Sequence, residues 1–324
     1  MKLLYKTAAV ILNIILLATL FACSGSNLSA QEKSVTIKMI VKKDNGSFWT
    51  VVKMGAEAAG KEFGVNVDFD GPADENDIDG QIRLVNESVD KKPDALVLAA
   101  GDYVRLVGAV EKAYAEKIPV IIIDSDIKSN KTKGFIGTDN VDSGKKLGET
   151  LLKEVGDTCS IAVMSFIKGA ANADQREEGF FEAIKAEPGV KLLSKEYSNS
   201  DENTAERLTE ELVKKYPDID AIVCLNAYGT TGTARAIEKL GLAGKVKIIG
   251  FDNTPEEISF MEKDVIQSLV TQNPFSMGYL GVKYALDVLN GETIPKSTNT
   301  DSKVINKDNM YLPENQKLVF PFTN

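Results

Sequence analysis

Polar side chains follow several of the apolar runs in this sequence, in positions where a ligand could reach them. Asp124 comes directly after the run at 120–123, and Asp252 comes directly after the run at 246–251. A carboxylate accepts hydrogen bonds from two hydroxyl groups without needing a proton partner. These two aspartates could therefore bind a hydroxyl-rich molecule; the alternative is that each caps a helix just beyond its strand.

Other side chains near these runs have chemistry that would complete such a site. Arg176 lies where a predicted helix begins and could donate a fork of hydrogen bonds, although a solvated surface arginine is the alternative. Asn226 and Gln272, at the ends of two runs, each offer a donor and an acceptor. Phe48 fits the apolar face of a predicted helix, whereas Trp49, the only tryptophan, lies off that face. An aromatic ring there could stack on an apolar ligand surface.

Composition excludes several classes of function. The chain contains no histidine, which removes Ser-His and Cys-His catalysis and the commonest transition-metal ligand. The formal charge of −9 argues against binding a nucleic-acid backbone. The segment 137–146 lacks the spacing of a phosphate loop and has Lys146 where a hydroxyl is needed. The acidic segment 75–86 departs from a calcium loop at its first and twelfth positions, so we expect Asp77 or Asp79 to cap a helix there. We predict no cofactor and no metal.

The site residues require a scaffold, and the apolar pattern predicts one of alternating strands and helices. Strands are expected over 35–41, 65–69, 95–99, 119–124, 160–164, 190–197, 221–225, 246–251 and 268–272. Helices are expected over 48–63, 78–90, 104–116, 144–155, 176–186, 204–215, 231–240, 255–261 and 277–289.

This alternation indicates an α/β fold with two doubly wound parallel sheets. The nearly unbroken β-branched run at 119–124 is typical of a parallel strand covered on both faces. Each half of the chain places an aspartate, Asp124 or Asp252, at the carboxyl end of a strand. Because ligands of open α/β sheets bind outside the carboxyl strand ends, two sheets facing each other there would enclose a cleft.

The start of the chain is typical of an exported lipoprotein. Two lysines precede a mostly apolar run at 7–21, which is too short for a confident transmembrane helix. This run is followed by Ala22, a small residue, and then by Cys23. The pair resembles the bacterial lipoprotein box. We predict a signal peptide over 1–22, lipid attachment at Cys23, a polar tether over 23–33 and an extracytoplasmic location on the cell membrane. The alternative is a buried cysteine near an ordinary cleavage site.

Seven motifs, in order over roughly residues 34–310, resemble those of the type I periplasmic sugar-binding proteins, the ribose-binding and related group. They are Ser47-Phe48-Trp49 with Gly55-Ala56, the strand 119–124, Gly137-Thr138-Asp139-Asn140, the helix motif 175–180, Leu225-Asn226, the segment 250–255 and Thr271-Gln272-Asn273-Pro274.

The resemblance implies a set of ligand contacts: Phe48, Trp49, Asp124, Arg176, Asn226, Asp252 and Gln272. Three positions depart from the family. Gly46 stands where many relatives have an asparagine, and Ser125 replaces an arginine. Asp174 falls where some relatives carry a second arginine, so we predict that it joins the site. With fewer positive groups, another pentose, a hexose or a polyol is as open as ribose.

The resemblance also implies two doubly wound lobes joined by a three-strand hinge near 137–139, 272–274 and 301–304. We predict an N-terminal lobe of 34–138 with 273–303, and a C-terminal lobe of 139–272 with 304–324. The implied function is that of a monomeric, non-enzymatic binding protein that delivers a sugar to the permease of an ABC importer. The alternative is a sensing subunit that docks on a membrane histidine kinase or a chemoreceptor.

Two further classes share parts of the pattern. An exported glycosidase would need two carboxylates about 5 to 10 Å apart around the scissile bond. Asp124 and Asp252 could approach that distance, but nothing in the sequence positions a water. Repressors of the LacI type share the fold, yet an export signal occupies the place of their DNA-binding helices.

Overall fold

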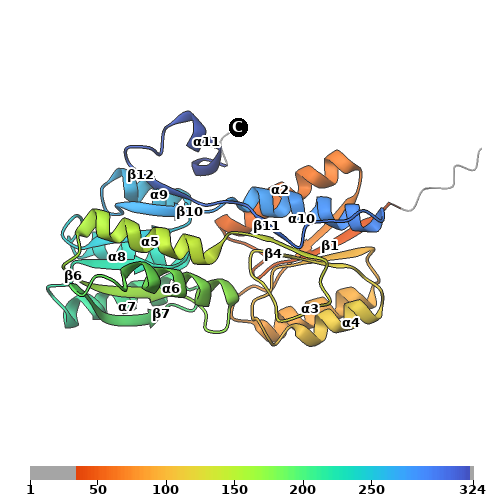
Figure 1. The fold of residues 1–324 in the computed structure, drawn as a ribbon, viewed down its shortest axis with the longest axis horizontal. Helices are drawn as coiled ribbons and strands as arrows, with labels where there is room; N and C mark the ends of the chain where they lie inside the picture. Colours follow the sequence, from red (N-terminus) through yellow and green to blue (C-terminus); the bar gives the residue numbers. More distant parts are fainter. Residues whose placement is uncertain (1–33, 322–324) are drawn as a thin grey trace, which may run out of the picture. The chain divides into compact units, whose positions relative to one another are not determined.

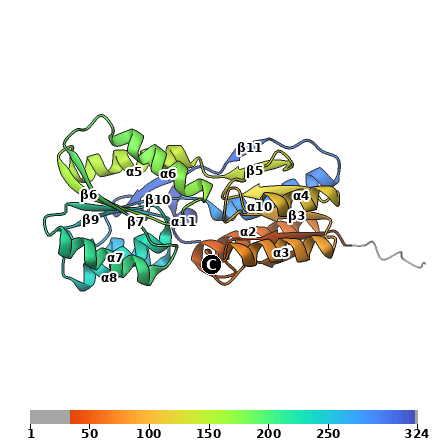
Figure 2. The same ribbon diagram turned by 90° about the horizontal axis from the view of Figure 1, so that it is seen from below.

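The computed structural model describes residues 34–321. Residues 35–321 belong to one compact unit. This unit contains two lobes, each built on a six-stranded sheet with helices on both faces (Figures 1 and 2). No helix among the described residues has the length and apolar character needed to cross a membrane. The predicted signal peptide, Cys23 and the tether lie outside the described residues.

The sheet of the first lobe has parallel strands in the order β11-β5-β4-β3-β1-β2. Its strands are β1 (Thr36–Ile40), β2 (Asn66–Asp70), β3 (Ala95–Leu98), β4 (Val120–Ile123), β5 (Gly134–Gly137) and β11 (Ser297–Asn299). Its helices are α2 (Ser47–Phe63) and α10 (Pro274–Leu289) on one face, and α3 (Ile78–Asp90) and α4 (Val107–Ala115) on the other.

The sheet of the second lobe repeats this arrangement in the order β12-β10-β9-β8-β6-β7, with only β12 antiparallel to its neighbour. Its strands are β6 (Cys159–Ser165), β7 (Val190–Tyr197), β8 (Ala221–Cys224), β9 (Lys247–Phe251), β10 (Ser268–Thr271) and β12 (Lys303–Asn306). Its helices are α5 (Asn140–Val155) and α6 (Ala171–Ile184) on one face, and α7 (Glu202–Lys215), α8 (Ala227–Lys239) and α9 (Pro255–Glu262) on the other, with α11 (Pro313–Val319) near the C-terminus.

Each sheet is buried on both faces, as the unbroken apolar strands predict. In β3, Ala95 and Val97 pack against α2 and α10, whereas Leu96 and Leu98 pack against α3 and α4. All four side chains are fully buried. The predicted architecture of two α/β lobes is therefore confirmed.

The chain passes between the two sheets three times, after β5, after β10 and after β11. The three passages are bonded to one another. The Thr138 hydroxyl donates to Gln272 Oε1 at 2.7 Å, which joins the first passage to the second. The Thr300 amide donates to the Gly137 carbonyl at 2.9 Å, which joins the third to the first. The passages thus lie side by side between the lobes.

Most strands were predicted correctly, but four helices begin earlier than predicted. The structure starts α5, α6, α8 and α10 at Asn140, Ala171, Ala227 and Pro274. The prediction that a helix begins near Arg176 is therefore wrong, because Arg176 lies well inside α6. The short strands β5, β11 and β12 and the helix α11 were not predicted as elements.

Candidate ligand-binding site

Asp124 and Asp252 occupy equivalent places in the two lobes. Asp124 directly follows β4 and Asp252 directly follows β9, with φ angles of 60° and 76°. Each backbone amide donates to the next strand, at 3.0 Å to the Ile136 carbonyl and at 2.9 Å to the Val270 carbonyl. A left-handed backbone at a residue other than glycine costs about 1–2 kcal/mol, although aspartate tolerates it comparatively well. The same left-handed conformation occurs at both aspartates, so the fold holds each carboxylate at its strand end.

The two carboxylates line one pocket, which lies between the lobes. Seven of the eight ligand-binding residues predicted from the sequence contribute to it: Phe48, Trp49, Asp124, Arg176, Asn226, Asp252 and Gln272. The remaining lining residues are Lys42, Glu75, Phe166, Asn172, Ala227 and Tyr228. The volume of this pocket is about 40 Å³. Polar side chains therefore nearly fill the space between the two strand ends.

Asp124 is bound from both lobes. The Lys42 ammonium of the first lobe lies 2.8 Å from Asp124 Oδ2, and both side chains are about 4% exposed. From α6 in the second lobe, Asn172 Nδ2 donates to the same oxygen at 3.4 Å. Asn172 also accepts a long hydrogen bond from Lys42 at 3.4 Å. This buried ion pair is thus part of the contact between the lobes.

The Asp252 carboxylate accepts hydrogen bonds from two groups, one in its own lobe and one in the second passage. Gln272 Nε2 donates to Asp252 Oδ1 at 2.7 Å, and the Ala227 amide donates to Asp252 Oδ2 at 3.0 Å. Asp252 therefore accepts from the first amide of α8, the helix before its strand, whereas Thr254 caps α9, the helix beyond its strand. Asn226 is the N-cap residue of α8, where its side chain accepts from the Gly229 amide at 2.9 Å.

Arg176 is buried, with 2% of its surface exposed, and all its hydrogen bonds in the described chain are internal. Its guanidinium donates to Asn140 Oδ1 at 2.9 Å, to the Leu225 carbonyl at 2.8 Å and to Gln272 Oε1 at 3.1 Å. Its plane lies 3.8 Å from the centre of the Phe251 ring. The alternative of a solvated surface arginine is therefore wrong.

The close approach of α5 and α6 puts Arg176 in this place. A Cβ atom at Gly144 would lie 2.2 Å from the Arg176 carbonyl oxygen, and one at Gly179 would lie 1.9 Å from the Val141 carbonyl oxygen. Only glycine permits such backbone contact. The glycine of the helix motif 175–180 thus allows the two helices to pack, and the arginine one turn earlier then reaches Asn140 at the start of α5.

Phe48 and Trp49 form an aromatic wall at the start of α2. Trp49 is 2% exposed, and its ring meets that of Phe48 edge-on at a centroid distance of 4.9 Å. Its Nε1 donates to Glu75 Oε1 at 2.8 Å. The prediction from helix periodicity that Trp49 lies off the buried face is wrong, because this third residue of α2 is covered by the loop that carries Glu75.

Gly46 lies next to Tyr228, a side chain from the opposite lobe. A Cβ atom at Gly46 would lie 2.9 Å from the Tyr228 hydroxyl, and the φ of 99° at Gly46 also favours glycine. The Lys43 ammonium lies 4.9 Å from the centre of the Tyr228 ring. The departure from the family at this position therefore makes room for Tyr228, which lines the pocket.

Burial controls the electrostatics of the pocket. It raises the pKa of Asp252, and the nearby Arg176 cation only partly offsets that shift. Burial likewise lowers the pKa of Arg176, against the pull of Asp252 and Asp124. The lining contains two basic side chains, Lys42 and Arg176, and three acidic ones, Asp124, Asp252 and Glu75. The fixed charges thus favour a ligand that carries no negative charge.

Asp174 is the predicted site residue that the structure does not bring to this pocket. It lies exposed in the first turn of α6, whereas Asn172 of the same turn lines the cavity. Four polar residues line the pocket that were not predicted from the sequence: Lys42, Glu75, Asn172 and Tyr228. Lys42 follows the first strand much as Asp124 follows its own, so the strand-end pattern could have identified it. The nearby acidic segment acts as predicted at Asp77, which caps α3 by accepting from the Gly80 amide at 2.8 Å.

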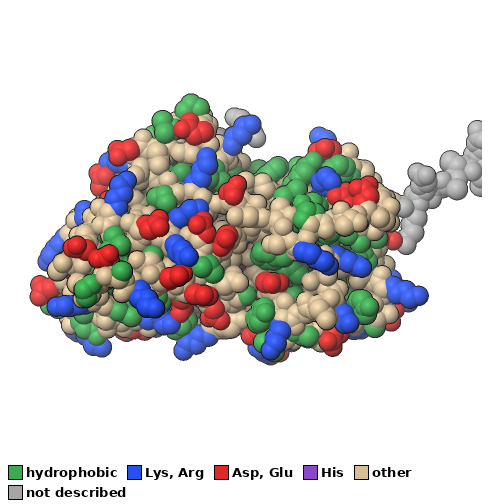
Figure 3. Space-filling model, in the orientation of Figure 1, with side chains coloured by type: hydrophobic (Ala, Val, Ile, Leu, Met, Phe, Trp, Pro, Cys, Tyr) green, Lys and Arg blue, Asp and Glu red, His purple; other side chains and the backbone are tan. Residues whose placement is uncertain are grey.

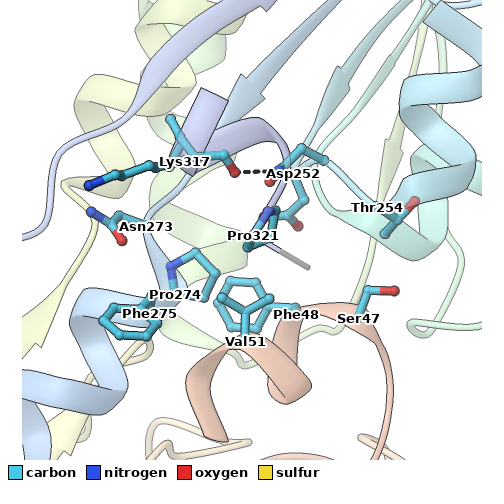
Figure 4. A pocket seen from close by; sticks show the side chains of 12 residues that line it. Ser47, Phe48, Val51, Asp252, Thr254, Asn273, Pro274, Phe275, Lys317 and Pro321 are labelled. Carbon is cyan, nitrogen blue, oxygen red and sulfur yellow. Dashed lines mark hydrogen bonds between the residues drawn. The ribbon is translucent and has the colours of Figure 1, made fainter. Parts of the chain in front are cut away.

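A second, smaller pocket adjoins the first on the side of α11. Phe48 and Asp252 line both pockets, and Lys317 and Pro321 bound this one from the C-terminal segment (Figure 4). The side-chain Nδ2 of Asn253, the residue after Asp252, donates to the Leu318 and Val319 carbonyls of the C-terminal segment at 2.8 Å and 3.2 Å. The cavity is about 30 Å³. The C-terminal segment therefore closes one side of the cleft.

Comparison with known proteins agrees with this architecture. A family model described as "Periplasmic binding protein domain" matches residues 37–293. The chain is 31% identical over 269 residues to a D-ribose/D-allose-binding protein of Pseudomonas aeruginosa, covering 79% of this chain and 83% of that protein. It is 28% identical over 291 residues to the D-allose-binding periplasmic protein of Escherichia coli, covering 87% and 92%.

Solved structures give the same result. An ABC transporter solute binding protein from Agrobacterium vitis with bound D-fucose superposes with a TM-score of 0.86 at 35% identity, covering 88% of this chain and all of that one. These relatives are binding proteins and not enzymes, which removes the glycosidase alternative. Because the family match spans most of the chain, this protein belongs to the periplasmic binding protein domain family, as its resemblance to the type I sugar-binding proteins predicted.

Proposed function

We propose that this protein captures an uncharged sugar in the pocket between its two lobes. The observation that carries the proposal is that Asp124 and Asp252, one from each lobe, line a single cavity with the same backbone conformation. Each carboxylate can accept hydrogen bonds from neighbouring hydroxyls of a sugar ring. Asn226 and Gln272 add amide donors, and the Phe48–Trp49 wall offers an apolar surface to the C–H face of the ring.

The relatives support the chemical class of the ligand. Two similar proteins are named for D-allose, and the similar Agrobacterium vitis structure holds D-fucose. Neither sugar carries a charge, which agrees with the excess of carboxylates in this pocket.

Ligand entry requires the lobes to separate. A cavity of about 40 Å³ has room for roughly three water molecules, which is less than a sugar ring needs. We propose that the three passages between the sheets are the hinge, and that the lobes comprise 34–138 with 273–303 and 139–272 with 304–324. A sugar would replace the cross-lobe contacts, such as that of Lys42 with Asn172, and would favour closure because only the closed form lets both aspartates bind it.

The proposed partner is the permease of an ABC importer, since the similar solved structure belongs to such a transporter. We also propose that the protein is exported, is anchored through lipid on Cys23 and acts outside the cytoplasm as a monomer. Deleting the gene should abolish uptake of the ligand. Intact uptake with loss of a transcriptional or chemotactic response would instead identify the sensing subunit that we consider as the alternative.

The sugar proposal is tested by the fluorescence of Trp49, the only tryptophan. The chain from Ser24 onward contains the whole compact unit and is titrated with pentoses, hexoses, polyols and, as a charged control, sugar acids. We expect a saturable change with at least one uncharged sugar and none with the acids. Silence across the panel, with no thermal stabilisation by any member, would refute the proposal.

A further inference from the structure

A groove at the outer end of the first lobe has only basic groups among its charged lining residues. It has a volume of about 600 Å³ and lies between the C-terminal ends of α4 and α10 and the residues that precede β4 and β5. Lys117, Lys131 and Lys133 supply the positive charge, and Tyr114 and Leu289 supply the apolar surface. Both apolar side chains are exposed, at 52% and 36%.

These three lysines converge on one groove with no acidic side chain among its lining residues. Within residues 34–321, none of them forms an ion pair with a carboxylate. Lys131 instead lies over the Tyr114 ring, 4.8 Å from its centre. By contrast, the adjacent Lys112 is paired with Asp90. On the face shown in Figure 3, acidic and basic side chains are interspersed. An unpaired basic groove on a chain of net charge −9 is therefore a local attractor for anions.

The groove lies at the same end of the lobe as the start of the compact unit. Strand register places the beginning of β1 level with the beginnings of β3 and β4. Because neighbouring strands lie about 4.8 Å apart, Thr36 is about 10 Å from the start of β4 across the sheet. The predicted lipid-attachment residue Cys23 precedes Ser34 by 11 positions, a reach of at most about 40 Å. A membrane that holds the lipid is thus within reach of this end of the lobe.

We propose that this groove binds the anionic headgroups of the anchoring membrane. The ammonium groups would contact lipid phosphates, and Tyr114 and Leu289 would face the interfacial region, where aromatic side chains are favoured. The ligand pocket lies at the opposite, carboxyl ends of the same strands and stays accessible. The proposal rests on the proposed lipid anchor and goes beyond it, because it assigns an orientation that a flexible tether alone does not impose.

The test uses the chain from Ser24 onward, which lacks the lipid, so that vesicle binding reports on the groove alone. Vesicles of phosphatidylcholine, with or without phosphatidylglycerol, are sedimented with the protein at low and high salt. We expect binding only to the anionic vesicles and weakening by salt. Changing Lys117, Lys131 and Lys133 together to glutamine should reduce partitioning by up to about a hundredfold, since each lysine near an anionic surface contributes roughly fivefold.

The matched control changes three exposed lysines of the second lobe that also form no ion pair among the described residues: Lys153, Lys185 and Lys245. It removes the same charge and should leave partitioning within about twofold of wild type. Equal losses in both variants, absence of binding to anionic vesicles, or saturation of the groove by glycerol phosphate without vesicle binding would overturn the proposal. Sugar titration of both variants keeps this outcome separate from the sugar-binding proposal, because neither set of lysines lines the ligand pocket.

Discussion

The change of Asp252 to asparagine is the substitution that most sharply separates a ligand-binding role from a structural one. Asp252 Oδ1 accepts from Gln272 at 2.7 Å and Oδ2 accepts from the Ala227 amide at 3.0 Å. An asparagine has only one acceptor oxygen, so its NH₂ group must face one of these donors in either orientation. The variant keeps the shape of the side chain and removes its charge.

The expected loss of affinity follows from those bonds. A hydrogen bond to a charged acceptor contributes about 1.5–3 kcal/mol, roughly twice a neutral one, so losing the charge toward two sugar hydroxyls costs about 2–3 kcal/mol. The donor that asparagine leaves without an acceptor is unpaired in the free protein as well, so it lowers the stability of the protein and not its affinity. At 1.4 kcal/mol for each factor of ten, the Kd for the sugar should rise by about one and a half to two orders of magnitude.

The assay is calorimetric titration of wild type, Asp252→Asn and Asp174→Asn with the best sugar of the panel. Asp174→Asn removes the same charge from a residue of the same lobe that is exposed and outside the pocket. Its Kd should stay within about twofold of wild type. An equal loss in both variants, or an unchanged Kd in Asp252→Asn, would refute the reasoning, because the effect would then not come from the pocket.

Three other outcomes are expected. Because burial raises the pKa of Asp252, sugar affinity should fall as the pH drops through that raised value, starting above the usual carboxyl range; a Kd that is constant across mildly acidic pH would contradict this. Burial also raises the pKa of Glu257 well above its ordinary value, so the unfolded chain ionises first as the pH rises. The free energy of unfolding should therefore decline with rising pH from about 4.5 upward in wild type and less so in Glu257→Gln, as measured by urea titration across about pH 4 to 8. Finally, Gly46→Ala should destabilise the closed form by about 1–3 kcal/mol, since the backbone at Gly46 has φ 99° and ψ 154° and the Tyr228 hydroxyl lies 2.9 Å from a Cβ there; X-ray scattering of the sugar-bound variant should show a larger radius of gyration than wild type.

The strand ends were predictable because an apolar run, and the polar residue that ends it, are local signals in the sequence. All four residues of β4 are β-branched, and the aspartate that follows them can be identified in the sequence. The placement of Asp124 and Asp252 in one pocket could also be predicted, because the carboxyl ends of two facing sheets must meet. These inferences depend on sequence pattern and not on the details of packing.

The first turns of the cleft helices were not predictable from apolar periodicity. Asn140 and Asn172 lie in the first turns of α5 and α6 and point their polar groups toward Arg176 and Asp124. Since these turns face polar groups instead of the core, the apolar repeat begins only one turn later. Asp174 also lies in the first turn of α6. The family resemblance placed it near the site, but its position on the helix exposes its side chain to solvent, away from the pocket.

The contacts across the cleft depend on tertiary structure. The burial of Trp49 follows from a loop that comes about 25 positions later and brings Glu75 to its indole nitrogen at 2.8 Å. The placement of Tyr228 against Gly46 requires both lobes. Neither contact has a signal within one helix or one strand, so only the folded chain reveals them.

A crystal structure of the protein with the sugar chosen from the panel tests the central claim most directly. We expect one sugar ring between the lobes, with hydroxyl oxygens at about 2.5–3.0 Å from the carboxylates of both Asp124 and Asp252 and with an apolar face against the Phe48–Trp49 wall. A sugar bound to one lobe only, or bound outside this pocket, would contradict it.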